Sequence, residues 1–335
     1  MTASRQTLSY LRNLFARRGI APRHRLGQNF LIDLNIHELI AREAAIEPVD
    51  VVLEVGPGAG ALTTLLAERA SAVVAVEVDP AMARLTCEAA SGRPNVRVLN
   101  VDALAGKHAI QPEVLDNLRA GLAVAPDRRL KLVANLPYSI ATPLISNLLV
   151  HPDLRPALLV VTIQLELAER MRAAPHTEAY GALSVVVQAL ADVELARVLP
   201  PKVFWPRPKV DSAVVKITPD AAKRAAVGDL AWFHAVVRRV FLHRRKNLRG
   251  VLHGQWRDRW TKPEVDALME GLGLDGQVRA EAMNVEEFIA LAQALKERLG
   301  PDAAAEPAGE EDVAGAGDEA GTDDEAGTDG GGHVE

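Results

Sequence analysis

Residues 51–60 read Val-Val-Leu-Glu-Val-Gly-Pro-Gly-Ala-Gly, a short apolar run followed by a glycine-rich turn. A helical pattern begins directly after the turn. Glycines let the backbone turn sharply and approach a ligand closely, and the first N–H groups of the following helix lack intrahelical partners. A strand that ends in such a turn therefore predicts a nucleotide site at the carboxyl end of a parallel sheet.

From residue 51 to residue 217, short apolar runs alternate with helical patterns, which is typical of an α/β sheet with crossover helices. Strands are expected at 51–55, 73–78, 96–100, 130–134, 157–165, 193–199 and 212–217. Helices are expected at 36–45, 60–69, 80–90, 141–150, 166–173 and 181–190. The proline-rich residues 200–208 are too few for a crossover helix. The sequence therefore predicts a seven-stranded sheet whose last strand is an antiparallel hairpin partner.

Three further segments flank this sheet. Helical patterns at 229–243, 245–253, 263–272 and 285–298 predict a small C-terminal α-helical domain. Residues 301–335 hold twelve Asp or Glu and no Lys or Arg, a composition that predicts a disordered acidic tail. We therefore expect a basic N-terminal arm at 1–28, an α/β domain at 29–222, the helical domain at 223–300 and the tail at 301–335.

The formal net charge of −6 comes from the acidic tail, and the rest of the chain is basic. Without the tail, 38 Lys or Arg face 32 Asp or Glu, and between Pro201 and Lys262 the numbers are 15 and four. Positive charge concentrated in this way favours binding to a phosphate backbone. The arm is free of acidic residues through Gln28, and we interpret it as facing RNA rather than as an organellar transit peptide.

The composition of the 335 residues, 48% hydrophobic and 24% charged, is that of an ordinary globular protein. No apolar run has the length needed to cross a bilayer. The single cysteine, Cys87, cannot form an internal disulfide, which favours a reducing compartment. We expect a cytoplasmic monomer without a membrane partner, and no cluster of side chains predicts a metal site.

Two classes of nucleotide ligand fit the glycine-rich turn. Gly56, Gly58 and Ala61 satisfy the G-x-G-x-x-A pattern of dinucleotide enzymes, and Glu77, after the second strand, suits a ribose in either class. The cluster Glu-x-Gly-Pro-Gly-x-Gly at 54–60 nevertheless resembles motif I of class I methyltransferases. Asp102, after the third strand, resembles the acidic residue that meets the adenine of their cofactor. Together these features favour S-adenosylmethionine over NAD.

The residues Asn135, Leu136, Pro137 and Tyr138 follow the fourth strand and carry the chemistry that we expect. An exocyclic adenine amine is a poor nucleophile, because its lone pair is delocalised into the ring. Two carbonyl acceptors, from the side chain of Asn135 and the backbone of Leu136, suit its N–H groups. Pro137 rigidifies the turn and Tyr138 can stack on the base. No covalent nucleophile or strong general base is needed.

Taken together, these motifs resemble the KsgA (RsmA) family of rRNA adenine N6,N6-dimethyltransferases. The resemblance runs from about residue 20 to 298, with the motifs in order. It rests on the segments 25–31 (Arg-Leu-Gly-Gln-Asn-Phe-Leu), 54–60, 76–79 (Val-Glu-Val-Asp), 102–103, 135–138, 206–214 (Pro-Arg-Pro-Lys-Val-Asp-Ser-Ala-Val), 244–249 (Arg-Arg-Lys-Asn-Leu-Arg) and 279–281 (Arg-Ala-Glu).

The resemblance implies a class I methyltransferase (Rossmann-like) domain at 29–222 and an RNA-binding helical domain at 223–300. It implies S-adenosylmethionine as the cofactor and immature small ribosomal subunits as the partner. Two adjacent adenosines near the 3′ end of small-subunit rRNA would be dimethylated during ribosome biogenesis. The implied cofactor contacts are Gln28, Asn29, Leu31, Gly56, Gly58, Glu77, Asp102 and Asn135.

On the substrate side, the resemblance implies that Asn135 and Leu136 orient the amine, while Tyr138 and Phe204 flank the base. Trp205 stands next to Phe204, so the sequence leaves open which ring meets the adenine. Arg244, Arg245, Lys246 and Arg249 stand at near-helical spacing, which suits successive phosphates.

Three other functions remain open at this point. One is methylation of large-subunit rRNA, as in the erythromycin-resistance group, or the related role of a mitochondrial transcription factor. The second is a nonenzymatic assembly factor, although the intact residues 135–138 favour retained chemistry. The third is an NAD oxidoreductase, for which the second domain offers no evident acid or base at a hydride site. The sequence does not assign a role to the acidic tail.

Overall fold

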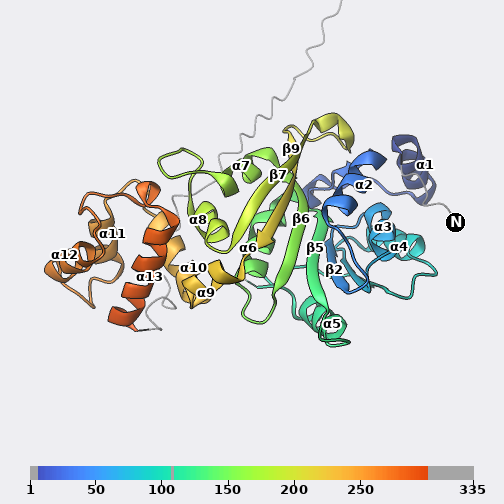
Figure 1. Ribbon diagram of the computed structural model, residues 1–335. Helices are drawn as coiled ribbons and strands as arrows, with labels where there is room; N and C mark the ends of the chain where they lie inside the picture. Colours follow the sequence, from blue (N-terminus) through green and yellow to red (C-terminus); the bar gives the residue numbers. More distant parts are fainter. Residues whose placement is uncertain (1–6, 107–108, 301–335) are drawn as a thin grey trace, which may run out of the picture.

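The computed structural model describes residues 7–106 and 109–300. A seven-stranded sheet with the order β4-β3-β2-β5-β6-β9-β7 forms its centre (Figure 1). Its strands are β2 (Asp50–Val55), β3 (Ala72–Val76), β4 (Val96–Leu99), β5 (Arg129–Asn135), β6 (Pro156–Gln164), β7 (Ala191–Leu199) and β9 (Ser212–Pro219). The strands from β4 to β6 pair in parallel, whereas β9 is antiparallel to both β6 and β7. The predicted α/β sheet with an antiparallel last strand is confirmed.

Helices cover both faces of the sheet because alternate strand residues point to opposite sides. Val52 belongs to the buried cluster that contains residues of α2 (Leu34–Glu43) and α3 (Ala61–Ala67). Val51 and Leu53 belong to a larger cluster on the other face. The helices that cover this face of the sheet in the larger cluster include α5 (Pro112–Leu122), α6 (Tyr138–Val150), α7 (Leu165–Arg172) and α8 (Ala182–Gln188). The helix α4 (Pro80–Ala89) follows β3.

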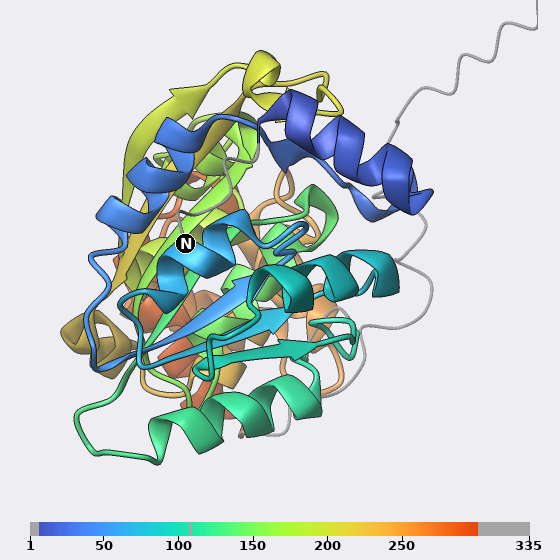
Figure 2. The same ribbon diagram turned by 90° about the vertical axis from the view of Figure 1, so that its right-hand side faces the viewer.

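The N-terminal arm contains a helix, α1 (Leu8–Arg18), that was not expected. Leu11 and Phe15 are buried in a third cluster, with Ala59, Met82 and Leu85. Figure 2 shows α1 in dark blue across the end of the molecule, beside the loop before β9. A two-stranded sheet of β1 (Phe30–Leu31) and β8 (Phe204–Trp205) lies in the same region and was not expected either. The short helices η1 (His24–Leu26) and η2 (Pro201–Val203) precede these strands.

The C-terminal region is helical, as predicted, with α9 (Ala221–Val227), α10 (Leu230–Phe241), α11 (Leu248–Gln255), α12 (Lys262–Gly271), η3 (Ala280–Ala282) and α13 (Val285–Leu299). Its core is continuous with the larger sheet cluster. Tyr180 is fully buried, and its hydroxyl donates to the carbonyl of Met283 at 2.8 Å. Trp232 Nε1 donates to the carbonyl of Ala292 at 2.6 Å. Across the described residues, no helix is long and apolar enough to cross a membrane.

Candidate active site

Three segments that are distant in sequence meet at the carboxyl ends of β2 and β5. They are the segment 26–30 after η1, the glycine-rich turn after β2, and the turn between β5 and α6. We call residues 26–30 the strap. Together they enclose a small cavity, which is lined by Leu26, Gly27, Gln28, Asn29, Phe30, Gly56, Gly58, Glu77, Val78, Asn135, Leu136, Pro137 and Tyr138. The structure thus brings together most of the site residues predicted from the sequence.

The turn after β2 needs glycines because a side chain at Gly56 or Gly58 would collide with neighbouring residues. Gly56 and Gly58 have φ angles of 73° and 59°, in the left-handed region that L side chains rarely adopt. A Cβ on Gly56 would lie 3.0 Å from Pro137 Cδ, and one on Gly58 would lie 3.0 Å from the ring of Phe30. The turn therefore packs directly against the strap and against the turn after β5.

Glu77 stands at the end of β3 with its carboxylate at the cavity. Its Oε1 accepts from the backbone N–H of Asp79 at 2.9 Å, and its Oε2 accepts from that of Gly58 at 3.4 Å. The residue is 6% exposed, and burial raises the pKa of its carboxyl to about 7. A carboxylate held in this position is a hydrogen-bond acceptor for the hydroxyl groups of a ribose.

The turn after β5 is anchored at both ends. Leu136 N donates to the carbonyl of Thr162 on β6 at 3.1 Å, and the Tyr138 hydroxyl lies 2.6 Å from Ser212 Oγ on β9. Asn135 Nδ2 donates to the carbonyl of Asn29 in the strap at 2.9 Å. Because the amide nitrogen is used there, the Asn135 side-chain oxygen is the end left to accept a hydrogen bond from a ligand.

The strap is held by the buried carboxylate of Asp79, which also caps α4. Gln28 Nε2 donates to Asp79 Oδ2 at 3.1 Å, and the Arg23 Nε atom lies 3.5 Å from the same oxygen. Gln28 Oε1 accepts from the backbone N–H of Arg23 at 2.8 Å. Through these contacts Gln28 helps to hold the strap in place.

An aromatic cluster supports the strap from outside. The ring of Phe30 lies 5.2 Å from that of Phe15 on α1 and 6.3 Å from that of Trp205. Arg12 places its guanidinium 5.9 Å from the Trp205 ring, as a cation–π contact. Sequence reasoning missed α1, although Leu8, Leu11 and Phe15 stand at helical spacing. It also missed Trp205 as a support for the strap.

Three of the residues predicted to contact the cofactor or the target base do not line the cavity. Leu31 and Phe204 pair across the two-stranded sheet and are 4% and 3% exposed, within one apolar cluster. Asp102 is exposed, and its Oδ1 accepts from the backbone N–H of Leu104 at 2.9 Å. Among the rings named for the base, Tyr138 is the one that lines the cavity in the described chain.

The basic segment 244–249 has two conformations, a turn at 244–247 and the first residues of α11 from Leu248, so the helix predicted at 245–253 begins three residues later than expected. Its conformation changes at Asn247, whose side chain accepts from Gly250 N and caps α11. Arg244 lies 3.2 Å from Glu281, and Arg249 forms two hydrogen bonds with Asp266. The turn lies beside 278–281, because Leu248 N donates to the carbonyl of Val278. Arg245 and Lys246 are exposed.

The cavity has a volume of about 50 Å³, which is close to that of one or two water molecules. A nucleoside-sized ligand therefore requires the strap or the lining side chains to move. Larger hollows lie elsewhere, including one of about 430 Å³ beside α9. The small cavity is the candidate site because the glycine turn, an acceptor for ribose and the amide of Asn135 all face it.

Comparison with known proteins agrees with this geometry. Residues 20–297 match the family described as Ribosomal RNA adenine dimethylase. The chain belongs to this family. It is 40% identical over 286 residues to the ribosomal RNA small subunit methyltransferase A of Moorella thermoacetica, with 84% of this chain and 96% of the relative covered. For the protein of the same name from Lactiplantibacillus plantarum, identity is 41% over 279 residues, covering 83% and 91%. The helix α1 precedes the matched residues.

Two solved structures share the fold. The dimethyladenosine transferase of Plasmodium falciparum superposes with a TM-score of 0.64 at 24% identity, covering 79% of this chain and 97% of that one. The 23S rRNA methyltransferase ErmE gives a TM-score of 0.54 at 28% identity, covering 80% and 100%. The expected class I methyltransferase fold and the predicted family are thus confirmed.

Proposed function

We propose that this chain transfers methyl groups from S-adenosylmethionine to the N6 amino groups of two adjacent adenosines near the 3′ end of small-subunit rRNA, twice each, during ribosome biogenesis. One observation carries the proposal. The Asn135–Tyr138 turn closes the same cavity that the glycine-rich turn and Glu77 line. A methyl donor and an amine acceptor therefore have adjoining places in a family of rRNA adenine dimethylases.

The residues at the cavity fit this cofactor. The absence of a Cβ at Gly56 and Gly58 lets the turn pack against Pro137 and Phe30 at the edge of the cavity, and the Glu77 carboxylate suits ribose hydroxyls. We assign the adenine amino group of the cofactor to Asp102. Asn29 and Gln28 close over the ligand through the strap, with Leu31 behind it. When bound, S-adenosylmethionine supplies an electrophilic methyl group on a sulfonium.

On the acceptor side, the protein has to favour a tetrahedral amine. The side-chain oxygen of Asn135 and the backbone carbonyl of Leu136 accept the two N–H hydrogens, which directs the nitrogen lone pair toward the methyl carbon. Pro137 fixes the direction of the Leu136 carbonyl, and Tyr138 stacks on the adenine. Phe204 is a second flanking ring only after the two-stranded sheet rearranges, since it is buried there.

The amine loses one proton in each transfer, and Glu77, the carboxylate of the described cavity lining, is assigned to the ribose of the cofactor. The nitrogen carries positive charge after attack on the methyl carbon, so it is strongly acidic at that stage and releases its proton to water. For the second methylation, one N–H remains for Asn135 or Leu136 to accept. The first methyl group then takes the place of the other hydrogen.

RNA is expected to approach along the helical region. A groove of about 370 Å³ runs between α6, α8 and α10, and its lining includes Ser139 and Thr142, directly after Tyr138. Arg238 lines the same groove. The turn before α11 adds the exposed Arg245 and Lys246. We assign phosphate contacts to Arg245 and Lys246, together with Arg244 and Arg249, whose acidic neighbours must release them first.

The substrate is tested by offering methyl-labelled S-adenosylmethionine with undermethylated small subunits and, separately, with large-subunit rRNA. Because relatives at about 40% identity are named small-subunit methyltransferases, we expect the label to enter the small-subunit rRNA. Label on large-subunit rRNA alone would favour the function named for ErmE. We further propose that the enzyme is cytoplasmic and acts as a monomer. Sedimentation during turnover checks the oligomeric state.

A further inference from the structure

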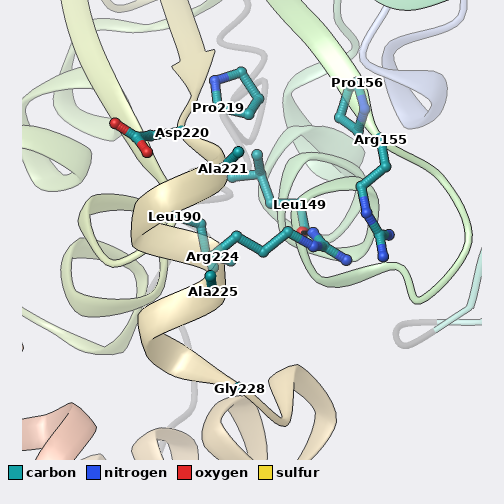
Figure 3. A pocket seen from close by; sticks show the side chains of 10 residues that line it. All are labelled: Leu149, Arg155, Pro156, Leu190, Pro219, Asp220, Ala221, Arg224, Ala225 and Gly228. Carbon is teal, nitrogen blue, oxygen red and sulfur yellow. Dashed lines mark hydrogen bonds between the residues drawn. The ribbon is translucent and has the colours of Figure 1, made fainter.

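A second hollow lies at the end of the sheet opposite the candidate active site. It has a volume of about 430 Å³ and stands where β6 begins, β9 ends and α9 begins. Its apolar wall is formed by Leu149, Leu190, Pro156 and Pro219. Figure 3 shows two arginine side chains extending into it from opposite sides, Arg224 from α9 and Arg155 from the segment before β6.

These two guanidinium groups have backbone partners but no acidic one among the described residues. Arg224 donates to the carbonyls of Leu149 and His151, both at 2.6 Å, and so caps the end of α6. Arg155 donates to the carbonyl of His151 at 3.2 Å. The one acidic residue of the lining, Asp220, points away from them (Figure 3) and caps α9.

The neighbouring side chains do not neutralise the positive charge of Arg155 and Arg224. Burial and the neighbouring Arg155 both lower the pKa of Arg224. Arg119 is a third cation near His151, and it pairs with Asp153 at 3.2 Å. Asp153 is therefore already engaged. Two adjacent guanidinium groups beside an apolar wall form a site that attracts carboxylates.

The helix α13, which ends at Leu299 shortly before the acidic segment 301–335, contacts residues next to this hollow. On α13, Gln293 Nε2 donates to the carbonyl of Ala226, and Lys296 Nζ pairs with Asp229 at 2.7 Å. Asp229 directly follows Gly228, which lines the hollow. From Lys296 to Gly300, the last residue described, the chain advances about 6 Å as a helix. The segment then supplies Asp302, Glu306, Glu310 and Glu311 within its first residues.

We propose that the acidic segment 301–335 docks in cis on the hollow beside α9, with its carboxylates on Arg155 and Arg224. The length of chain suffices, because six extended residues span about 20 Å. The charges are complementary, since the segment carries twelve carboxylates and no cation. Docked there, it neutralises the arginine pair and opposes the binding of other polyanions at this end of the sheet.

The proposal is tested in the full-length chain by paramagnetic broadening of amide signals. A nitroxide is placed at Ala308→Cys in a Cys87→Ser background, because Cys87 is the one native cysteine. At low salt, the amide signals of α9 and of residues 151–156 are expected to lose intensity. The loss should disappear at about 0.5 M salt, where charge interactions are screened within a few ångström.

Two variants remove the contact from its two sides. Arg155→Glu acts on the hollow and leaves the α6 cap of Arg224 in place. Four substitutions in the segment, Asp302→Asn, Glu306→Gln, Glu310→Gln and Glu311→Gln, leave the described residues unchanged. Both are expected to abolish the broadening. The matched control is Arg97→Glu, the same charge change at an exposed position on β4, the opposite edge strand, and it should preserve the broadening.

Four results would overturn the proposal. One is broadening that persists in Arg155→Glu, and another is broadening confined to a different basic segment such as 242–249. The third is broadening that appears when spin-labelled chains are mixed with isotope-labelled chains that carry no nitroxide, because the occupant is then a second copy. A complete absence of broadening at low salt also rejects docking.

Discussion

Replacing Glu54 by Gln is expected to flatten the pH dependence of the free energy of unfolding. Glu54 lies on β2 below the glycine-rich turn and is 2% exposed. Its Oε2 and the Oγ1 of Thr63 on α3 both lack a hydrogen-bond partner among the described residues. Burial raises the pKa of this carboxyl from 4.5 to about 8. The folded chain therefore keeps a proton that the unfolded chain releases.

The sign and size of the effect follow from this difference. Between pH 4.5 and about 8 the folded state binds more protons than the unfolded state, so stability falls as the pH rises. At about 1.4 kcal/mol per unit, the loss approaches roughly 4 kcal/mol at pH 8 as an upper limit. Glutamine has nearly the same shape and no proton to release, so Glu54→Gln should be the more stable protein at pH 8.

Urea unfolding followed by circular dichroism at pH 5, 6, 7 and 8 measures the difference. The gap between Glu54→Gln and the unsubstituted chain should widen with pH in favour of the variant. An exposed glutamate on α13 provides the control, and Glu297→Gln should leave the pH dependence unchanged. Parallel curves for Glu54→Gln and the unsubstituted chain would refute the reasoning, because they would mean that Glu54 is ionised in the folded state at neutral pH.

Four further predictions concern the site. Asn135→Ala should lower methyl transfer at least about 100-fold, with rRNA affinity in filter binding nearly unchanged; a matched loss of both would assign Asn135 to RNA binding. Because burial raises the pKa of Glu77 to about 7, calorimetric affinity for S-adenosylmethionine should fall about tenfold from pH 8 to pH 6, and Glu77→Gln should weaken binding and remove that dependence. Reversing Arg245 and Lys246 to Glu should weaken rRNA binding and reduce its salt slope by roughly two; an unchanged slope would exclude this turn. Phe15→Ala should release α1 from Phe30 and weaken cofactor binding, while equal affinity would show that α1 does not support the strap.

The sheet and the two functional turns were predictable because their signals are local. Each strand is a short apolar run, and the glycines at 56 and 58 are needed by the turn itself, as their positive φ angles show. The helix α5 was missed, although Pro112 at its start and Val114 and Leu118 on one face carry helical signals.

Contacts between distant segments were not predictable in the same way. The pairing of Leu31 with Phe204 joins residues far apart in the sequence through strands of two residues each. Such short strands have no periodicity that reveals their direction. The helix predicted at 245–253 is present as α11, but it begins only at Leu248, because the side chain of Asn247 caps its start and leaves 244–246 in a turn. The hydrogen bond between Asn135 and Asn29 of the strap also joins residues far apart in the sequence, so no local pattern reveals it.

The most direct test of the central claim is the identity of the methylated nucleoside. Undermethylated small subunits are incubated with the enzyme and S-adenosylmethionine, and their rRNA is digested and analysed by mass spectrometry with mapping of the modified positions. The account predicts N6,N6-dimethyladenosine at two adjacent positions near the 3′ end, and its absence with Asn135→Ala. Methyl groups on another base or another atom of adenine, or full activity of Asn135→Ala, would contradict it.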